Sequence, residues 1–274
     1  MNRQATRDQV VTALRAAGCV FAEDEARLLL AAARDEAELG DLVRRRAGGE
    51  PLEHVLGWVE FCGLRIAVDH GVFVPRRRSE FLVRQAVRAG RRLAERPAGP
   101  RGAGPAWVVI ADVCCGSGAL GVAVAAALGG AELHAADLDP AAVACARRNV
   151  RVAGGQVYAG DLYQALPAGL RGRVDILLAQ VPYVPTAEID LLPAEARQHE
   201  PKMALDGGTD GLDLLRRLAS GAVDWLAPGG RLLTETSERQ AGLAADIVRA
   251  NGLTARLTRS EPMDATVIAG TRVR

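Results

Sequence analysis

Lysine is almost missing from this sequence: Lys202 is the only one among 34 basic residues, and all the others are arginine. The 33 acidic residues nearly balance them, so the formal net charge is +1. Because so small a charge generates no strong field, nothing in the composition attracts the chain to a nucleic acid or an anionic membrane. We expect neither a nucleic acid nor a membrane among its partners.

Cysteine is scarce as well, and its five positions form no C-x-x-C pair and no cluster with the spacing of zinc ligands. We therefore expect no bound metal, and an odd number of scattered thiols fits a reducing compartment. Apolar runs are short. None reaches the roughly 18 residues needed to span a bilayer, and the first residues lack the apolar core of a signal peptide. These absences together predict a cytoplasmic protein.

Hydrophobic residues make up 49% of the chain and charged residues 24%, the proportions of an ordinary globular protein. Residues 6–48 carry apolar side chains at helical spacing, with Gly18 and Gly40 as the expected breaks between helices. The arginine run at 44–46 is interpreted as a solvated helix end. We expect residues 1–57 to form a small helical N-terminal domain.

Residues 58–105 change character and are expected to bridge two domains. Partial alternation of apolar residues over 58–74, with a turn signal at Gly63, predicts a β-hairpin. Helical spacing returns over 79–94. The stretch 95–105 is rich in proline and glycine and is predicted to be a linker.

From residue 106 to 274, strands and helices alternate. Repeated β-α units with apolar strands predict an α/β, Rossmann-like domain whose parallel sheet is covered by helices on both faces. Ligands of such sheets bind beyond the carboxyl ends of the strands, near the point where the strand order reverses. We expect seven strands, at 107–113, 132–138, 156–161, 174–180, 231–237, 254–260 and 265–273. The helices are expected at 119–128, 140–150, 211–227 and 240–251.

The first of these strands runs into the loop Asp112-Val-Cys-Cys-Gly-Ser-Gly118-Ala-Leu-Gly121. Its glycines permit a tight turn and a close approach of a ligand to the free N–H groups at the start of the next helix. They also match the dinucleotide pattern G-x-G-x-x-G, which is weak evidence on its own. A carboxylate at Asp112 would repel a pyrophosphate, but it suits the ammonium and sulfonium groups of S-adenosylmethionine. We therefore expect S-adenosylmethionine as the cofactor.

Two further acids follow the next two strands. Asp137 stands at the end of the second strand, where the ribose diol of a nucleoside would lie. Asp161 ends the third strand, where it is expected to accept a hydrogen bond from an adenine amino group. Asp139 precedes Pro140 and is interpreted as the N-cap of the next helix. Three acids at successive strand ends around a glycine loop favour a nucleoside cofactor over three separate structural roles.

The fourth strand ends in Gln180-Val-Pro-Tyr183, and here the chain resembles the HemK/PrmC-type protein-(glutamine-N5) methyltransferases, the release factor glutamine methyltransferase family. The resemblance covers nearly the whole chain. Its motifs stand in the family's order as GGEPLEHVLGWVEFCGLRIAV (48–68), VFVPRRRSE (72–80), DVCCGSGALG (112–121), QVPY (180–183) and RQHEPKMALDGGTDGLD (197–213).

The resemblance implies a class I methyltransferase fold, S-adenosylmethionine as cofactor, and a helical domain that recognises a protein substrate. The cofactor-binding positions would be Asp112, Cys114, Cys115, Gly116, Ser117, Gly118, Asp137, Leu138, Asp161, Leu162 and Gln180. The catalytic positions would be Gln180, Val181, Pro182 and Tyr183. The substrate-binding positions would be Arg76, Glu80, Gln180, Tyr183, Glu200 and Pro201.

The chemistry expected at this corner is methylation of an amide nitrogen, a poor nucleophile because its lone pair is delocalised into the carbonyl group. In the family, an asparagine oxygen and the following backbone carbonyl accept hydrogen bonds from the amide and orient its nitrogen. Here these acceptors become Gln180 Oε1 and the Val181 carbonyl, while Tyr183 would lie against the amide and exclude water. Gln180 replaces the family's asparagine and Val181 its first proline, so the chain departs from the family's pattern at the reactive centre.

The acceptor that the resemblance implies is a peptide-chain release factor or a related protein, methylated on the glutamine of a Gly-Gly-Gln loop. Three alternatives stay open. The first is a nucleic-acid amine methyltransferase, which would need a basic groove that the net charge does not favour. The second is a small-molecule methyltransferase with an altered entrance. The third is a relic that binds the cofactor and transfers nothing.

Overall fold

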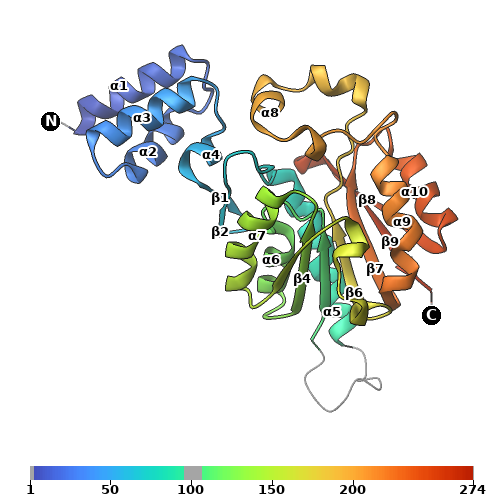
Figure 1. Cartoon of the computed structure of the whole chain (residues 1–274). Helices are drawn as coiled ribbons and strands as arrows, with labels where there is room; N and C mark the ends of the chain where they lie inside the picture. Colours follow the sequence, from blue (N-terminus) through green and yellow to red (C-terminus); the bar gives the residue numbers. More distant parts are fainter. Residues whose placement is uncertain (1–2, 96–106, 274) are drawn as a thin grey trace.

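The computed structural model describes residues 3–95 and 107–273, so the predicted linker 95–105 lies, apart from Glu95, outside the described residues. The described chain forms a helical N-terminal part that stands beside an α/β part built on one large sheet (Figure 1). Within those residues, no helix is long and apolar enough to cross a membrane.

The helical spacing at the start of the chain produces a small helical bundle with a core of its own. Leu14, Leu29 and Leu42 are buried there in a single apolar cluster. The predicted break at Gly18 is confirmed, because this glycine adopts a φ of +86° in the turn between the first two helices. The helices are α1 (Arg3–Ala16), α2 (Ala22–Ala32), α3 (Glu36–Ala47) and α4 (Leu52–Leu56).

The predicted break at Gly40 is wrong, since this residue lies inside α3. The helix begins instead after Asp35, whose side chain accepts a hydrogen bond from the Glu38 N–H and caps the first turn. Burial of Leu39 and Leu42 on one face of α3 outweighs the roughly 1 kcal/mol by which a mid-helix glycine disfavours the helix relative to alanine.

The arginine run at the end of α3 is solvated at Arg44, as predicted, but not at Arg46. The Arg46 side chain is only 12% exposed, and its Nε donates to Glu25 Oε2 of α2 at 2.7 Å. Its Nη1 lies 3.5 Å from Glu195 Oε2, which belongs to the α/β part of the molecule. Arg46 therefore links the helical part to the α/β part.

The predicted hairpin is confirmed as β1 (Trp58–Phe61) and β2 (Leu64–Ala67), which pair antiparallel. Positive φ angles at Cys62 and Gly63 form its tight turn. Asn149 anchors the hairpin to the sheet domain: it exchanges hydrogen bonds with the backbone of Ala67 and donates to the Ser117 carbonyl at 2.8 Å. The hairpin is thereby fixed against the glycine loop.

The helix that follows the hairpin, α5 (Glu80–Ala94), packs into the same core as the sheet. Leu82, Val83 and Ala86 are buried in one cluster with Ile110 of the first sheet strand. The short turn η1 (Arg77–Ser79) leads into it. The layer that covers this face of the sheet therefore begins well before residue 106.

The large sheet has the seven strands that the sequence predicts, in the order β5-β4-β3-β6-β7-β9-β8. Five of them run parallel, as expected. Strand β9 is antiparallel to both of its neighbours, β7 and β8, so β8 points in the same direction as the other five strands and β9 alone among the seven is reversed. The connection 261–264 is too short for a parallel crossover and makes a hairpin instead. The strands are β3 (Val109–Val113), β4 (Glu132–Asp137), β5 (Gln156–Ala159), β6 (Val174–Ala179), β7 (Leu226–Thr236), β8 (Leu253–Ser260) and β9 (Ala265–Arg272).

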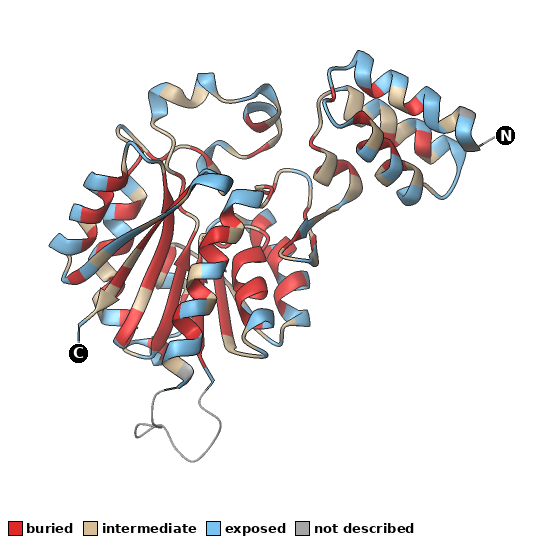
Figure 2. Ribbon diagram, turned by 180° about the vertical axis from the view of Figure 1, so that it is seen from behind, coloured by how far each residue is buried: buried red, intermediate tan, exposed pale blue. Residues whose placement is uncertain are grey.

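Helices cover both faces of this sheet, and buried residues line the space between the layers (Figure 2). Ile110 of β3 joins the core under α5, α6 and α7, whereas its neighbours Val109 and Ala111 join the core under α9 and α10. This alternation explains why β3 is apolar at every position but Asp112. The helices are α6 (Ala119–Ala127), α7 (Pro140–Val152), α9 (Asp213–Trp225) and α10 (Ala241–Ala250).

Residues 184–208, which we call the cover segment, lie over the carboxyl ends of the strands (Figure 1). The segment starts soon after β6, next to the point where the strand order reverses between β3 and β6. It contains η4 (Thr186–Leu191), α8 (Ala194–His199) and η5 (Lys202–Ala204). The other short turns are η2 (Leu162–Ala165), η3 (Ala168–Leu170) and η6 (Glu261–Met263).

Candidate active site

The glycine loop after β3 is tightly curled. Cys114, Gly116 and Gly118 adopt positive φ angles of +54°, +55° and +77°. The Gly116 N–H donates to Asp137 Oδ2 at 2.8 Å, which ties the loop to the end of β4. The loop then leads directly into α6, as the sequence predicts for a ligand-binding turn.

Asp112 lies behind this loop and is completely buried. Its Oδ2 accepts a hydrogen bond from the Gly121 N–H at 2.9 Å, but Oδ1 has no hydrogen-bond partner within the described residues. Burial raises the pKa of Asp112 to about 8, with a smaller contribution from the negative charge of Asp137. A positively charged group near Oδ1 would offset the free-energy cost of burying the carboxylate. A direct role of Asp112 toward a cationic ligand stays a prediction.

The acids at the next two strand ends both line the cavity described below. Asp137 Oδ1 accepts from the Asp139 N–H at 2.9 Å, and burial raises the pKa of Asp137. Asp139 is confirmed as the N-cap of α7, because its side chain accepts from the Ala141 N–H. Asp161 pairs with Arg217 of α9 at 2.6 Å, a partner that no sequence motif had indicated.

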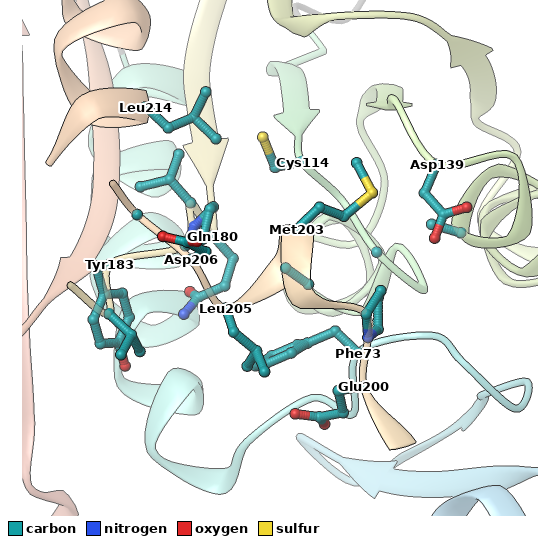
Figure 3. A pocket seen from close by; sticks show the side chains of 18 of the residues that line it. Phe73, Cys114, Asp139, Gln180, Tyr183, Glu200, Met203, Leu205, Asp206 and Leu214 are labelled. Carbon is teal, nitrogen blue, oxygen red and sulfur yellow. The ribbon is translucent and has the colours of Figure 1, made fainter. Parts of the chain in front are cut away.

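A cavity of about 1220 Å³ opens between the strand ends and the cover segment. In Figure 3, Gln180 and Tyr183 stand on one side of this space and Asp139 on the other, with Met203 of the cover segment between them. The predicted site residues that line it are Arg76, Cys114, Cys115, Gly116, Ser117, Asp137, Leu138, Asp161, Leu162, Gln180, Val181, Pro182, Tyr183, Glu200 and Pro201. The cavity therefore brings together the predicted cofactor and substrate residues.

Three predicted site residues stay outside the lining of this cavity as the described residues form it: Glu80, Asp112 and Gly118. For Glu80 the reason is its position at the start of α5, where Oε1 accepts from the Cys62 N–H at 3.3 Å. Its carboxylate faces the hairpin, and a contact of Glu80 with substrate stays a prediction. Its neighbour Ser79 does line the cavity.

Gln180 directly follows β6 and presents an acceptor without a partner. Its Oε1 is buried, and no donor in residues 3–95 or 107–273 makes a hydrogen bond to it. A buried polar atom left in this state costs free energy on the order of 1–3 kcal/mol, unless a ligand supplies the missing donor. Gln180 is thus prepared to accept a hydrogen bond from a bound molecule.

Tyr183 is held at its hydroxyl by two charged side chains. Arg78 Nη2 donates to the hydroxyl at 2.6 Å, and the hydroxyl donates to Glu235 Oε1 at 3.0 Å. Burial, together with the nearby Glu235 carboxylate, raises the pKa of Tyr183 well above its usual value. The phenol therefore keeps its proton at neutral pH. Neither Arg78 nor Glu235 was among the residues predicted for the site.

The two predicted substrate residues Arg76 and Glu200 form an ion pair of 2.5 Å, although they are far apart in sequence. Glu200 also accepts from the Val74 N–H at 3.1 Å, and its side chain is almost fully buried. Burial raises the pKa of Glu200, and the positive charge of Arg76 opposes this rise. The pair joins the segment before α5 to the cover segment.

Residues 180–183, which we call the reactive corner, have their backbone fixed by the residue that precedes α10. Gln240 Nε2 donates to the Tyr183 carbonyl at 2.9 Å and to the Asp210 carbonyl at 2.8 Å. Gly211 packs so closely that a Cβ placed there would lie 2.3 Å from the Tyr183 carbonyl oxygen. This close approach explains why position 211 needs glycine. The prediction of the site from sequence did not use this signal.

Comparisons with known proteins agree with this geometry. The family model of the Methyltransferase small domain matches residues 106–191. The chain is 35% identical over 234 residues to the release factor glutamine methyltransferase of Geobacter sulfurreducens, a match that covers 85% of this chain and 76% of that protein. It is 34% identical to the 4-amino-L-phenylalanine/4-methylamino-L-phenylalanine methyltransferase of Streptomyces pristinaespiralis, covering 77% of this chain and 70% of that protein.

A solved structure shows the same fold at low sequence identity. The ribosomal protein L11 methylase of Lactobacillus delbrueckii subsp. bulgaricus aligns with a TM-score of 0.51 and 16% identity, over 76% of this chain and 86% of that one. The class I methyltransferase fold expected from the sequence is thereby confirmed.

The residues present fit S-adenosylmethionine. Asp112 lies behind the glycine loop, outside the cavity lining, and its buried Oδ1 lacks a partner in the described chain. Asp137 and Asp161 line the same cavity on the side of the glycine loop, where they are available to a nucleoside. Leu138, Met203 and Leu205 add apolar surface to the wall of the cavity.

Proposed function

This chain belongs to the release factor glutamine methyltransferase family, and we propose that it methylates a glutamine side-chain amide in a peptide-chain release factor or a related protein. S-adenosylmethionine is the cofactor, and when bound it supplies the methyl group as an electrophile on a positively charged sulfur. The observation that carries the proposal is the buried Oε1 of Gln180, which has no partner in the described chain and belongs to a residue that lines the cavity beside Tyr183.

The task of the chain is to present an amide nitrogen in one orientation. We assign Gln180 Oε1 and the Val181 carbonyl as acceptors for the two amide hydrogens, which points the nitrogen toward the glycine loop and offsets its developing positive charge. The ring of Tyr183 covers the flat amide and keeps water away. Its phenol is neutral and already donates to Glu235, so it is not assigned as a base.

The substrate assignment is tested with the purified full-length protein, labelled S-adenosylmethionine and bacterial release factors. We expect label on the glutamine of the Gly-Gly-Gln loop, located by mass spectrometry of the digested product. The matched control is the same release factor with that glutamine replaced by asparagine, which should remain unlabelled. Absence of label on the glutamine of the natural release factor would remove the substrate assignment.

The role of Gln180 is tested by two variants. Gln180→Ala removes the acceptor and should lower kcat on the order of 100-fold. Gln180→Asn restores the family's side chain and should raise the rate of transfer to a release factor. If both variants transfer at the rate of the natural protein, Gln180 does not hold the amide.

A second acceptor class is favoured by one relative and by the departures at Gln180 and Val181. The relative from Streptomyces pristinaespiralis is named for methylating the amino group of 4-amino-L-phenylalanine, a free small molecule. An arylamine has N–H donors that Gln180 Oε1 would accept in the same way. Steady-state transfer to 4-amino-L-phenylalanine, compared with transfer to a release factor, decides between the two acceptors by the ratio of their kcat/KM values.

A further inference from the structure

Glu235 is a buried carboxylate next to the active site that has no place in the chemistry described so far. It lies near the end of β7, and its side chain is 2% exposed. It accepts hydrogen bonds from three side chains: Arg78 Nε at 2.9 Å, Ser79 Oγ at 2.8 Å and the Tyr183 hydroxyl at 3.0 Å. Because a buried carboxylate is stable only when it is paired and hydrogen-bonded, these three contacts hold one another in place.

The contacts fix Tyr183 at both of its ends. Its hydroxyl lies between Arg78 and Glu235, and its backbone carbonyl accepts from Gln240. The ring between these two anchors has little freedom to rotate or tilt. Glu235 itself is not part of the cavity wall formed by the described residues, so it reaches the reacting groups only through Tyr183 and Arg78.

The partners of Glu235 come from distant parts of the chain. Arg78 and Ser79 belong to the segment before α5, Tyr183 follows β6, and Glu235 belongs to β7. The same segment before α5 holds the cover segment through the ion pair of Arg76 with Glu200. Glu235 is thus the point at which this segment is fastened to the sheet and to the reactive corner.

We propose that Glu235 is a positioning residue for methyl transfer: through the Tyr183 hydroxyl it sets where the ring lies against the acceptor amide. The inference rests on the proposed function and extends it to a residue outside the cavity. The proton of the phenol is committed to Glu235, so the contribution of Tyr183 is the position of its ring. A displacement of about 1 Å in a positioning group lowers a rate on the order of 100-fold.

The kinetic test is a double-mutant cycle with Glu235→Gln and Tyr183→Phe. Each single variant should lower kcat on the order of 10- to 100-fold, while KM for the acceptor and Kd for S-adenosylmethionine stay within about two-fold. The double variant should be no slower than the slower single variant, because both changes release the same ring. Wild-type kcat in Glu235→Gln, or losses that multiply in the double variant, would overturn the proposal.

A matched control separates this effect from general loss of stability. Asp175, at the opposite end of the sheet, is a buried carboxylate that accepts from the Val109 N–H at 3.0 Å. Asp175→Asn makes the same acid-to-amide change away from the cavity, and it should leave kcat unchanged even where the protein is less stable. Activity that falls equally in Asp175→Asn and Glu235→Gln would show that Glu235 is merely structural.

A readout that needs no acceptor tests the position of the ring directly. The chain has three tyrosines, so ring-labelled tyrosine gives few NMR signals, which single Tyr→Phe variants assign. Glu235→Gln should shift or broaden the Tyr183 signal and leave those of Tyr158 and Tyr163 in place. An unchanged Tyr183 signal would refute the positioning role. If the natural protein labels no release factor, the proposed function fails while this measurement still decides on Glu235.

Discussion

Replacing Asp112 by asparagine is expected to stabilise the protein at neutral pH and to weaken its binding of the cofactor. The carboxyl group of Asp112 is fully buried, and one of its oxygens has no partner in the described chain. Its pKa of about 8, compared with about 3.9 in an unfolded chain, means that the folded state disfavours the carboxylate. An asparagine of nearly the same shape keeps an acceptor for the Gly121 N–H and carries no charge.

The sign and size of the effect follow from these two pKa values. Between about pH 4 and pH 8 the folded protein retains a proton that the unfolded chain has lost, so the contribution of Asp112 to stability falls as pH rises. At pH 7 the cost is roughly 4 kcal/mol, at about 1.4 kcal/mol for each pH unit. The buried amide N–H of the asparagine costs about 1–3 kcal/mol in return. The net gain for Asp112→Asn at pH 7 is therefore about 1–3 kcal/mol.

Urea denaturation of both proteins without cofactor, at several pH values from 5 to 8, measures this difference. The stability difference between the variant and the natural protein should grow by about 1.4 kcal/mol per pH unit, whatever constant cost the amide adds. Calorimetry should also show that S-adenosylmethionine binds the natural protein with release of a proton at pH 7, because a nearby cation favours the carboxylate. A stability difference that does not change with pH would refute the reasoning about Asp112.

Two further substitutions test the backbone. Gly118→Ala should weaken cofactor binding and lower the Tm, because Gly118 has a φ of +77° and a Cβ there would lie 2.8 Å from Val150 Cγ2. Calorimetry measures the Kd and a thermal melt measures the Tm. A normal Kd would show that the loop tolerates a side chain. Gly40→Ala should stabilise the folded protein by about 1 kcal/mol, because Gly40 lies inside α3 and a Cβ there would have nothing within 4 Å. A free energy of unfolding lower than that of the natural protein would contradict the helix assignment.

The elements that the sequence predicts well are those whose signals are local. Strands such as 174–180 are apolar runs of the right length, and the glycine loop follows its strand directly in the chain, so each could be placed without long-range information. The error at Gly40 has the opposite cause. A glycine is read as a helix break from sequence alone, but tertiary burial of Leu39 and Leu42 retains the helix. The reversed direction of β9 likewise depends on the length of one connection, the short turn from β8.

The part of the site that sequence reasoning missed is made of contacts between distant segments. Arg78 meets Glu235 and Asp161 meets Arg217 across large sequence separations, and no pattern near either residue indicates its partner. Glu80 shows how far a motif reaches. It stands two residues after Arg78, and at the start of α5 its side chain contacts the Cys62 N–H of the hairpin and does not line the cavity. The motif locates the segment, whereas the direction of each side chain in it depends on the fold.

This contrast separates the two halves of the active site. The cofactor half consists of successive strand ends, so its residues follow the order of the chain. The acceptor half is assembled at Tyr183, which is held by Arg78 from before the sheet, by Glu235 from β7 and by Gln240 from just before α10. Gln180 and Val181 lie where the halves meet, on a backbone fixed from both sides. We expect a change of side chain there to alter what is presented to the acceptor, so the departures at these two positions bear on the choice of acceptor.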